Sequence, residues 1–222
     1  MIISQNSNLH FNARNKTIRF ADDIVRKVNN EFPRISATKV EDWKSSNLNK
    51  SPAKKLFNKL SVVRNRVRLG FFNSYTFKNL VQSLVEPIKE IKVGNCGEAT
   101  DLGYLAARAN GLKNSYRAMV MTPDFRDYDH VVVIVDEDGQ NPYVLDAWLG
   151  FADYLPKAIE RYQKDFRQYF NFDKLKTDKM QFVSIEHNYQ KLKDFFDREF
   201  TQEEIENIRT IYPQFIVDNS KK

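Results

Sequence analysis

The residue of this chain best suited to chemistry is Cys96, the only cysteine among 222 residues. It stands in the stretch Val-Gly-Asn-Cys-Gly-Glu-Ala (93–99), and apolar residues then recur at helical spacing up to Ala109. This pattern places the thiol at a helix N-terminus, where unpaired backbone N–H groups and the helix dipole stabilise a thiolate. The glycine-flanked turn also leaves room for a substrate backbone. We therefore expect Cys96 to be a nucleophile.

A thiol nucleophile needs a base and a third group that orients the base. His130 begins an apolar strand (131–135), whereas the other two histidines lie in polar or charged segments. Asp146 ends the next strand candidate, and a turn cluster centred on Asp138 lies midway between the two residues. An antiparallel hairpin of this register places His130 and Asp146 opposite one another, while a slip of one residue would put them on opposite faces. We expect the three residues to form a Cys-His-Asp triad.

Residues beside these three have supporting roles or ordinary structural ones. The backbone N–H of Cys96 is the expected first oxyanion donor, and the side-chain amide of Asn95 is either a second donor or part of the turn. Glu98 is expected to favour the first helical turn. Trp148 is expected to pack against the strand pair or to shield the His–Asp pair from water.

The elements that must position the triad are helical in the first half of the chain and mixed in the second. The polar first dozen residues are expected to be loose, and residues 34–50 to form a connector. Apolar spacing and capping signals predict helices over 20–32, 52–67 and 77–85, with Pro87 ending or bending the third, and over 96–109, 156–170 and 201–211. Strands are expected over 116–122, 130–135, 143–145 and about 180–185.

These elements predict an α+β fold. Residues 1–92 form a mostly helical, basic N-terminal region, and residues 93–222 form a catalytic core with the cysteine helix, antiparallel strands and C-terminal helices. The two regions are separate subdomains or parts of one single domain. The helix that carries the nucleophile is expected to pack centrally on a small antiparallel sheet.

Charge is distributed unevenly along the chain. Residues 1–92 contain 18 Lys and Arg against 7 Asp and Glu, a net of +11, whereas residues 93–222 contain 17 against 22, a net of −5. A basic region of this kind attracts an acidic protein, anionic lipid headgroups or nucleic acid, or is simply solvated. Nucleic acid is the weakest case, because exposed aromatic residues do not clearly alternate with the basic positions. The expected partner is a protein substrate whose acidic surface docks on the basic residues of 1–92.

The cysteine count and the absence of long apolar runs indicate the kind of cellular compartment in which the protein works. One cysteine excludes an internal disulfide and a cysteine-based zinc site, and no metal or other cofactor is expected. The short apolar start, Met1-Ile2-Ile3, predicts no signal peptide, and no stretch is long enough to span a membrane. We expect a soluble protein that works in a reducing compartment, either the cytoplasm or a host cytosol reached through a specialised secretion system.

The order and setting of the triad resemble the papain-like and transglutaminase-like cysteine enzymes. The blocks "GNCGEA" (94–99), "YDHVVVIV" (128–135) and "YVLDAW" (143–148) are similar to the three blocks of that superfamily. The resemblance covers residues 93–150 and implies a papain-like or transglutaminase-like fold, with Cys96 as nucleophile, His130 as general base and acid, and Asp146 orienting His130. The chain lacks both the longer Cys-to-His separation of animal transglutaminases and the Gln before the Cys of papain. Its compact form is more similar to bacterial effector thiol enzymes.

The resemblance implies a thiol acyl-transfer enzyme that acts on amide bonds of a protein, as a glutamine deamidase, a transglutaminase or a cysteine protease. Two other functions fit the sequence: an arylamine-type N-acetyltransferase, which uses the same order of residues, and a non-catalytic binding module with a basic docking surface. The acidic cluster Glu203-Glu204-Glu206 is similar to the tail signals of type IV-secreted effectors. It also has a simpler reading, because Glu204 suits a capping box with Thr201.

Overall fold

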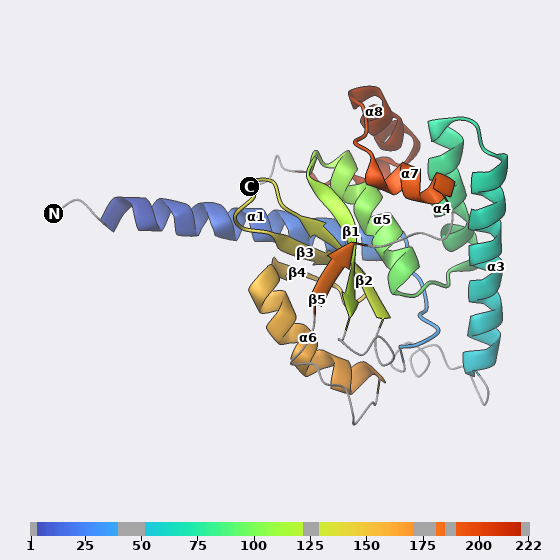
Figure 1. Ribbon diagram of the computed structural model, residues 1–222, viewed down its shortest axis with the longest axis horizontal. Helices are drawn as coiled ribbons and strands as arrows, with labels where there is room; N and C mark the ends of the chain where they lie inside the picture. The colour runs from blue at the N-terminus through green and yellow to red at the C-terminus, as the bar shows by residue number, and fades with distance from the viewer. Residues whose placement is uncertain (1–3, 40–51, 122–128, 171–180, 185–189, 219–222) are drawn as a thin grey trace.

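The computed structural model describes residues 4–39, 52–121, 129–170, 181–184 and 190–218. Over these residues the chain is α+β, with helices packed around an antiparallel sheet (Figure 1). Its helices are α1 (Ser4–Glu31), α3 (Pro52–Asn73), α4 (Phe77–Ile91), α5 (Cys96–Ala109), α6 (Leu155–Phe170), α7 (Gln190–Asp197), α8 (Gln202–Ile211) and the 3-10 turn η2 (Pro213–Phe215). Its strands are β1 (Ser115–Met121), β2 (Asp129–Val135), β3 (Tyr143–Asp146), β4 (Phe151–Tyr154) and β5 (Gln181–Ser184).

The sheet has the order β4-β3-β2-β1-β5, and each neighbouring pair is antiparallel. The four strands expected from the sequence are all present, and β4 is an additional one. Strand β4 has only four residues and no clear alternation of buried and exposed side chains, so the apolar pattern of the sequence does not predict it. The result is a meander from β1 to β4 that β5 extends at the other edge.

The β2–β3 hairpin is offset by two residues from the expected register. Val133, Ile134 and Val135 pair with Leu145, Val144 and Tyr143, so the turn is centred on Gly139 instead of Asp138. Gly139 has φ of +69°, a left-handed conformation that glycine adopts without strain, while Asp138 accepts N–H bonds from the next residues of the turn. Because the offset is even, positions 130 and 146 stay on one face of the sheet, as diagonal rather than opposite neighbours.

The first half of the chain is helical, as expected, but two boundaries differ. Helix α1 begins at Ser4, so the expectation that the first dozen residues are loose is wrong; the start of this helix projects from the rest of the molecule (Figure 1). Helix α4 continues through Pro87 to Ile91 and is not ended by it. Pro87 is buried, so packing around this helix outweighs the loss of one backbone hydrogen bond.

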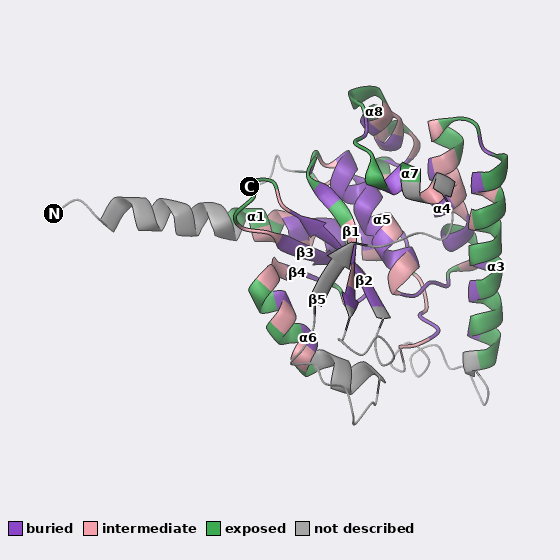
Figure 2. Ribbon diagram, viewed as in Figure 1, coloured by how far each residue is buried: buried purple, intermediate pink, exposed green. Residues whose placement is uncertain are grey.

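Helix α5 is the buried centre of the fold. It packs against β1, β2 and β3 and against α1, α4 and α8, and most of its residues are inaccessible to solvent (Figure 2). A Cβ at Gly103 would lie 3.6 Å from Val133 and 3.7 Å from Ala147, which are ordinary van der Waals distances, so this position of the helix faces the sheet without crowding. The helix ends at Ala109 with Asn110 as its C-cap, and Gly111 follows with a left-handed φ of +86°, a conformation that glycine adopts without strain. One apolar core contains residues from both halves of the chain.

The last helices follow the capping signals of the sequence. Thr201 caps α8, and its capping box with Glu204 is present as expected. Glu204 also accepts two hydrogen bonds from Arg198, so this acidic residue has a local structural role. Within the described parts of the chain, no helix is both long enough and apolar enough to cross a membrane.

Candidate active site

Cys96 is the first residue of α5, and the residues around it fix the start of that helix. The backbone N–H of Asn95 donates to Glu98 Oε2 (2.9 Å), and the other carboxylate oxygen of Glu98 accepts from Arg64 Nε on α3 (2.8 Å). Cys96 itself is half-buried, whereas Asn95 and Glu98 are buried. Glu98 therefore lies in the first turn, as expected, and ties α3 to the start of the helix that carries the thiol.

The glycines on either side of Cys96 have different surroundings. A Cβ at Gly94 would lie 2.9 Å from Glu98 Cβ and 3.3 Å from Arg34 Cδ, so only glycine fits there without a shift. At Gly97, no atom of the described residues lies within 4 Å of such a Cβ. The chain is thus crowded before the thiol and open after it, which leaves one side on which a substrate can approach.

His130 and Asp146 are in direct contact. His130 Nε2 lies 2.6 Å from Asp146 Oδ2, and both side chains are almost completely buried. Cys96 is also a neighbour of His130 and contributes to the raised pKa of its imidazole. Because Nε2 is taken by Asp146, Nδ1 is the ring nitrogen that remains for exchange of a proton with the sulfur. The structure therefore brings together all three residues that the sequence singles out, with His130 in the middle.

The carboxylate of Asp146 is held by four hydrogen bonds. Oδ2 accepts from His130 and from the hydroxyl of Tyr162 on α6 (2.9 Å), and Oδ1 accepts from the backbone N–H groups of Trp148 (3.0 Å) and Leu149 (2.8 Å). Burial alone would raise the pKa of the Asp146 carboxyl, but the charge and hydrogen bond of His130, with the other donors, lower it below its ordinary value. Asp146 is therefore ionised at neutral pH.

The charge of Asp146 determines the state of the imidazole. Burial alone would lower the pKa of His130, but the charge and hydrogen bond of Asp146, together with Cys96, raise it to about 10. At pH 7 the ring is thus an imidazolium, which donates through both nitrogens. Its positive charge lies next to the carboxylate of Asp146 and in the neighbourhood of Cys96.

Trp148 covers the imidazole, and Ser36 holds Trp148 in place. The centroids of the Trp148 and His130 rings lie 5.2 Å apart, and the indole N–H donates to Ser36 Oγ (3.0 Å). Trp148 is buried, and with Tyr162, whose ring lies 5.6 Å from His130, it encloses the histidine in aromatic surface. Both expectations for Trp148, packing on the strands and shielding of the pair, fit this position.

The side-chain oxygen of Asn95 is already occupied. It accepts hydrogen bonds from Ser36 Oγ (3.1 Å) and from the backbone N–H of Ala37 (2.9 Å). Asn95 therefore fastens the segment after α1 to the start of α5, which is the structural role that the sequence left open. The group of the Asn95 side chain that can still bond to a substrate is its NH₂ group, which donates hydrogen bonds.

Three residues of the site have no counterpart in the sequence-based expectation. Ser36 bonds to both Asn95 and Trp148, Tyr162 bonds to Asp146, and Thr100 Oγ1 donates to the backbone carbonyl of Val131 (2.6 Å). The last bond fixes α5 to β2 one turn after the cysteine and one residue after the histidine. The helical pattern of 156–170 marks Tyr162 only as a core residue, and Ser36 lies in a segment without any period.

A hollow of about 220 Å³ lies next to this site. The described residues that line it include two cations and no acid: Asn29, Pro33, Arg34, Ser36, Lys39, Gly94, Ala147 and Trp148. Lys39 Nζ lies 3.3 Å from the backbone oxygen of Trp148 and 5.8 Å from its ring centre. The hollow shares Trp148 and Gly94 with the surroundings of the triad and is suited to part of a substrate that carries negative charge.

Among the described residues, no group of three or more His, Cys, Asp or Glu side chains is arranged to hold a metal ion. No protein-family model, curated protein or solved structure matches the chain. The geometry around Cys96 is therefore the basis for a functional proposal.

Proposed function

We propose that this protein is a cysteine-dependent acyl-transfer enzyme of the papain-like or transglutaminase-like type, acting on amide bonds of a protein substrate. The observation that carries the proposal is the position of His130, which contacts Asp146 through Nε2 and whose pKa the neighbouring Cys96 helps to raise. A buried imidazolium between a carboxylate and a half-exposed thiol serves nucleophilic catalysis better than it serves stability.

In the proposed reaction, the Cys96 thiolate attacks the carbonyl carbon of a carboxamide or peptide bond. The oxyanion receives a hydrogen bond from the Cys96 backbone N–H at the start of α5, and the NH₂ group of Asn95 is the candidate second donor. His130 gives its proton to the departing amine, which leaves an acyl-thioester on Cys96. Water or an acceptor amine, deprotonated by His130, then attacks the thioester and releases the thiol.

Alkylation by iodoacetamide, followed by intact mass, tests the nucleophile. We expect Cys96 of the folded protein to react at pH 6 at least about tenfold faster than Cys96 of the urea-unfolded protein, because the imidazolium stabilises the thiolate. His130→Ala should remove this advantage. Equal rates for the folded and unfolded chains, with no effect of His130→Ala, would rule the proposal out.

The kind of amide reaction is read from the mass of a protein substrate. Casein is incubated with the enzyme and a primary amine such as putrescine. A protease would yield peptides, and a deamidase would add about one dalton per Gln, because ammonia is exchanged for water. A transglutaminase would add the mass of the amine less that of the ammonia released. Cys96→Ser serves as the inactive control in each case.

Delivery into a host cell as an effector is a separate proposal that rests on the Glu203-Glu204-Glu206 cluster. Glu204 caps α8 and pairs with Arg198, and Glu206 pairs with Arg209 (3.1 Å), so two of the three acids have local partners. A translocation reporter that lacks residues 200–222 and still transfers normally would exclude these residues as a signal.

A further inference from the structure

Helix α3 is basic along its whole length and lies on the surface. It contains six Lys and Arg and no Asp or Glu: Lys54, Lys55, Lys59, Arg64, Arg66 and Arg68. In the sequence, no acidic residue occurs between Asp42 and Glu86. The helix is exposed except for one buried stripe, and it forms a straight ridge along the edge of the molecule (Figures 1 and 2).

The side of α3 that faces away from the protein also carries apolar side chains. The stripe that packs on the core comprises Leu56, Leu60, Val63, Val67 and Phe71. On the opposite side, Val62, Leu69 and Phe72 are 49%, 56% and 79% exposed, and at 100° per residue they form one line. The same spacing puts Lys55, Lys59 and Arg66 on one flank of this line and Lys54 and Arg68 on the other. We call these eight residues the outer face of α3.

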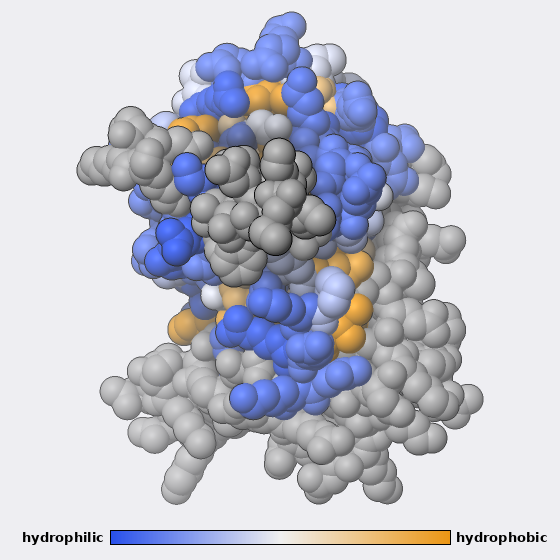
Figure 3. Space-filling view, turned by 90° about the vertical axis from the view of Figure 1, so that its left-hand side faces the viewer, coloured by the Kyte–Doolittle hydropathy of each residue, from blue (hydrophilic) through white to orange (hydrophobic). Residues whose placement is uncertain are grey.

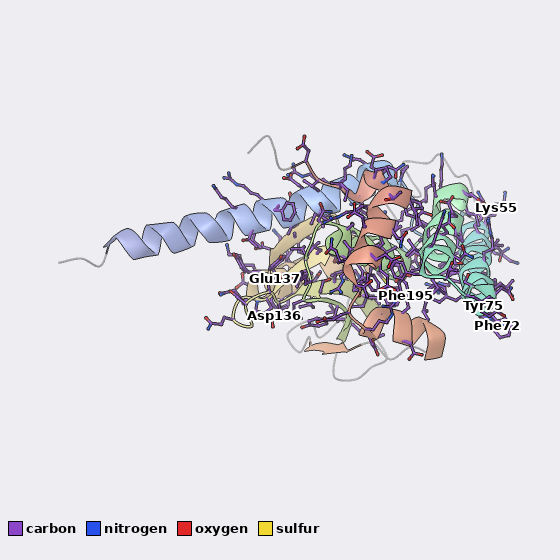
Figure 4. All side chains as sticks on the ribbon, turned by 90° about the horizontal axis from the view of Figure 1, so that it is seen from above. Lys55, Phe72, Tyr75, Asp136, Glu137 and Phe195 are labelled. Carbon is purple, nitrogen blue, oxygen red and sulfur yellow. The ribbon has the colours of Figure 1, made fainter. Side chains whose placement is uncertain are left out.

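The outer face ends in a projecting aromatic pair. Phe72 closes the line, and Tyr75, in the turn that follows the helix, is 92% exposed. In Figure 4 both residues and Lys55 lie at the edge of the molecule farthest from the start of α1. The described residues around the opposite end, seen in Figure 3, are mainly hydrophilic. Large exposed apolar groups beside a dense cationic surface mark a site of interaction.

We propose that the outer face of α3 binds the surface of an anionic lipid membrane. Helices that lie on membranes combine apolar side chains, which enter the headgroup region, with Lys and Arg that pair with lipid phosphates, and four to eight clustered cations are sufficient for attraction. A convex ridge about 33 Å long makes contact with a flat surface along its whole length, whereas a protein partner would have to offer a matching groove.

This binding mode would couple the membrane-bound helix to the helix that carries the thiol. Arg64 of α3 bonds to Glu98, two residues after Cys96, so the membrane-facing helix is directly linked to the start of α5. The protein would then meet substrates that are themselves attached to the membrane. The inference rests on α3 alone and does not depend on catalysis by Cys96.

Cosedimentation with lipid vesicles tests the inference. At about 0.1 M salt, the protein should bind vesicles of phosphatidylcholine with 30% phosphatidylserine and not vesicles of phosphatidylcholine alone, and binding should weaken as salt rises. The triple variant K54E/K55E/K59E should bind more than tenfold more weakly, since each lysine contributes about fivefold. Glutamate at positions 54 and 55 lies in the first turn of α3, where negative charge is favourable, and circular dichroism should show that the triple variant keeps the helical content of wild type.

Two controls distinguish binding to the membrane from a nonspecific affinity for negatively charged molecules. K113E/K157E/K164E makes the same change in net charge at exposed lysines outside α3 and should bind the vesicles within about twofold of wild type. F72S/Y75S should weaken vesicle binding severalfold without affecting binding to poly-L-glutamate. Equal losses from the two triple variants, absence of binding to the anionic vesicles, or binding that F72S/Y75S does not alter would each overturn the proposal, whether or not Cys96 is reactive.

Discussion

The hydroxyl of Tyr162 donates a hydrogen bond to the same oxygen of Asp146 that contacts His130. All three side chains are buried, so neither bond competes with water. Burial, followed by the nearby charge of Asp146, raises the pKa of Tyr162 well above its ordinary value. The tyrosine thus stays protonated and always donates, and we assign it as the residue that positions the carboxylate.

Tyr162→Phe should therefore weaken both the fold and the ionised state of Asp146. We expect the free energy of unfolding in urea to fall by about 2 kcal/mol, the range for a bond to a charged group. The pKa of the Asp146 carboxyl should rise, because one of the donors that lower it is lost. A carboxyl whose pKa is lowered in the folded state stabilises the fold fully above its ordinary pKa of 3.8. This stabilisation is lost as the pH falls through the pKa of the folded state. In the variant that pKa is higher, so acid unfolding should begin at a higher pH.

Tyr143→Phe is the matched control for this change. Tyr143 is also buried and lies on β3, but its hydroxyl has no hydrogen bond to a described residue. Its removal should leave the acid midpoint where it is in wild type. Identical acid shifts in the two variants would refute the positioning role of Tyr162.

The pH dependence of stability should report on the charged imidazole. The pKa of His130 is raised from 6.5 to about 10, so its contribution is complete below pH 6.5 and is lost as the pH rises to 10. We expect the difference in unfolding free energy between wild type and His130→Gln to be largest at pH 6 and to shrink steadily toward pH 10. Urea midpoints at five pH values test this, and a difference independent of pH would show that His130 is neutral in the folded protein.

Ser36→Ala should disturb the site from outside the triad. Without the hydroxyl, the buried indole N–H of Trp148 loses its acceptor, and Asn95 loses one of its two donors. An unsatisfied buried donor costs about 1–3 kcal/mol, and we expect a loss of this size in thermal or urea unfolding. Ser61→Ala removes an exposed hydroxyl from α3 and should cost less than about 0.5 kcal/mol. A Ser36 variant as stable as this control would contradict the role given to Ser36.

Alanine at the two glycines beside Cys96 should have opposite effects on stability. Gly94→Ala brings a Cβ within 2.9 Å of Glu98 Cβ, and the forced shift should cost about 1–3 kcal/mol and slow the alkylation of Cys96. Gly97 lies in the first turn of α5 and has open space around it, so Gly97→Ala should stabilise the protein by about 0.5–1 kcal/mol. Differential scanning calorimetry of the pair measures both, and a more stable Gly94→Ala protein would show that the crowding is absent.

The part of the site that the sequence predicts is the part encoded by local patterns. The spacing after Cys96 predicts α5, and the apolar run after His130 with the turn cluster predicts the β2–β3 hairpin. The observed pairing of β2 with β3 is shifted by two residues from the predicted one, because the turn is centred on Gly139, which has a positive φ, and not on Asp138. The contact between His130 and Asp146 survives because an even offset keeps side chains on one face.

The part that sequence patterns do not predict depends on contacts between distant segments. Ser36 lies in an irregular stretch, and its role follows only from the way this stretch runs beside Val93, through the parallel bridge between Ile35 and Val93. Tyr162 has the spacing of any core residue on α6, and its partner is set by where that helix packs. The hydrogen bond from the Asn95 backbone N–H to Glu98 follows a local pattern, since Asn-x-x-Glu before an apolar run is a capping-box pattern.

The bonds that shape the site join residues far apart in the chain. Ser36 and Trp148 are 112 positions apart, and Thr100 and Val131 are 31 apart. Loops of this size must close before such bonds can form, so the site is complete only when segments from both halves of the chain have packed together. A nascent chain lacks Tyr162 until α6 has been synthesised, so until then Asp146 is without the hydrogen bond that Tyr162 donates in the folded protein.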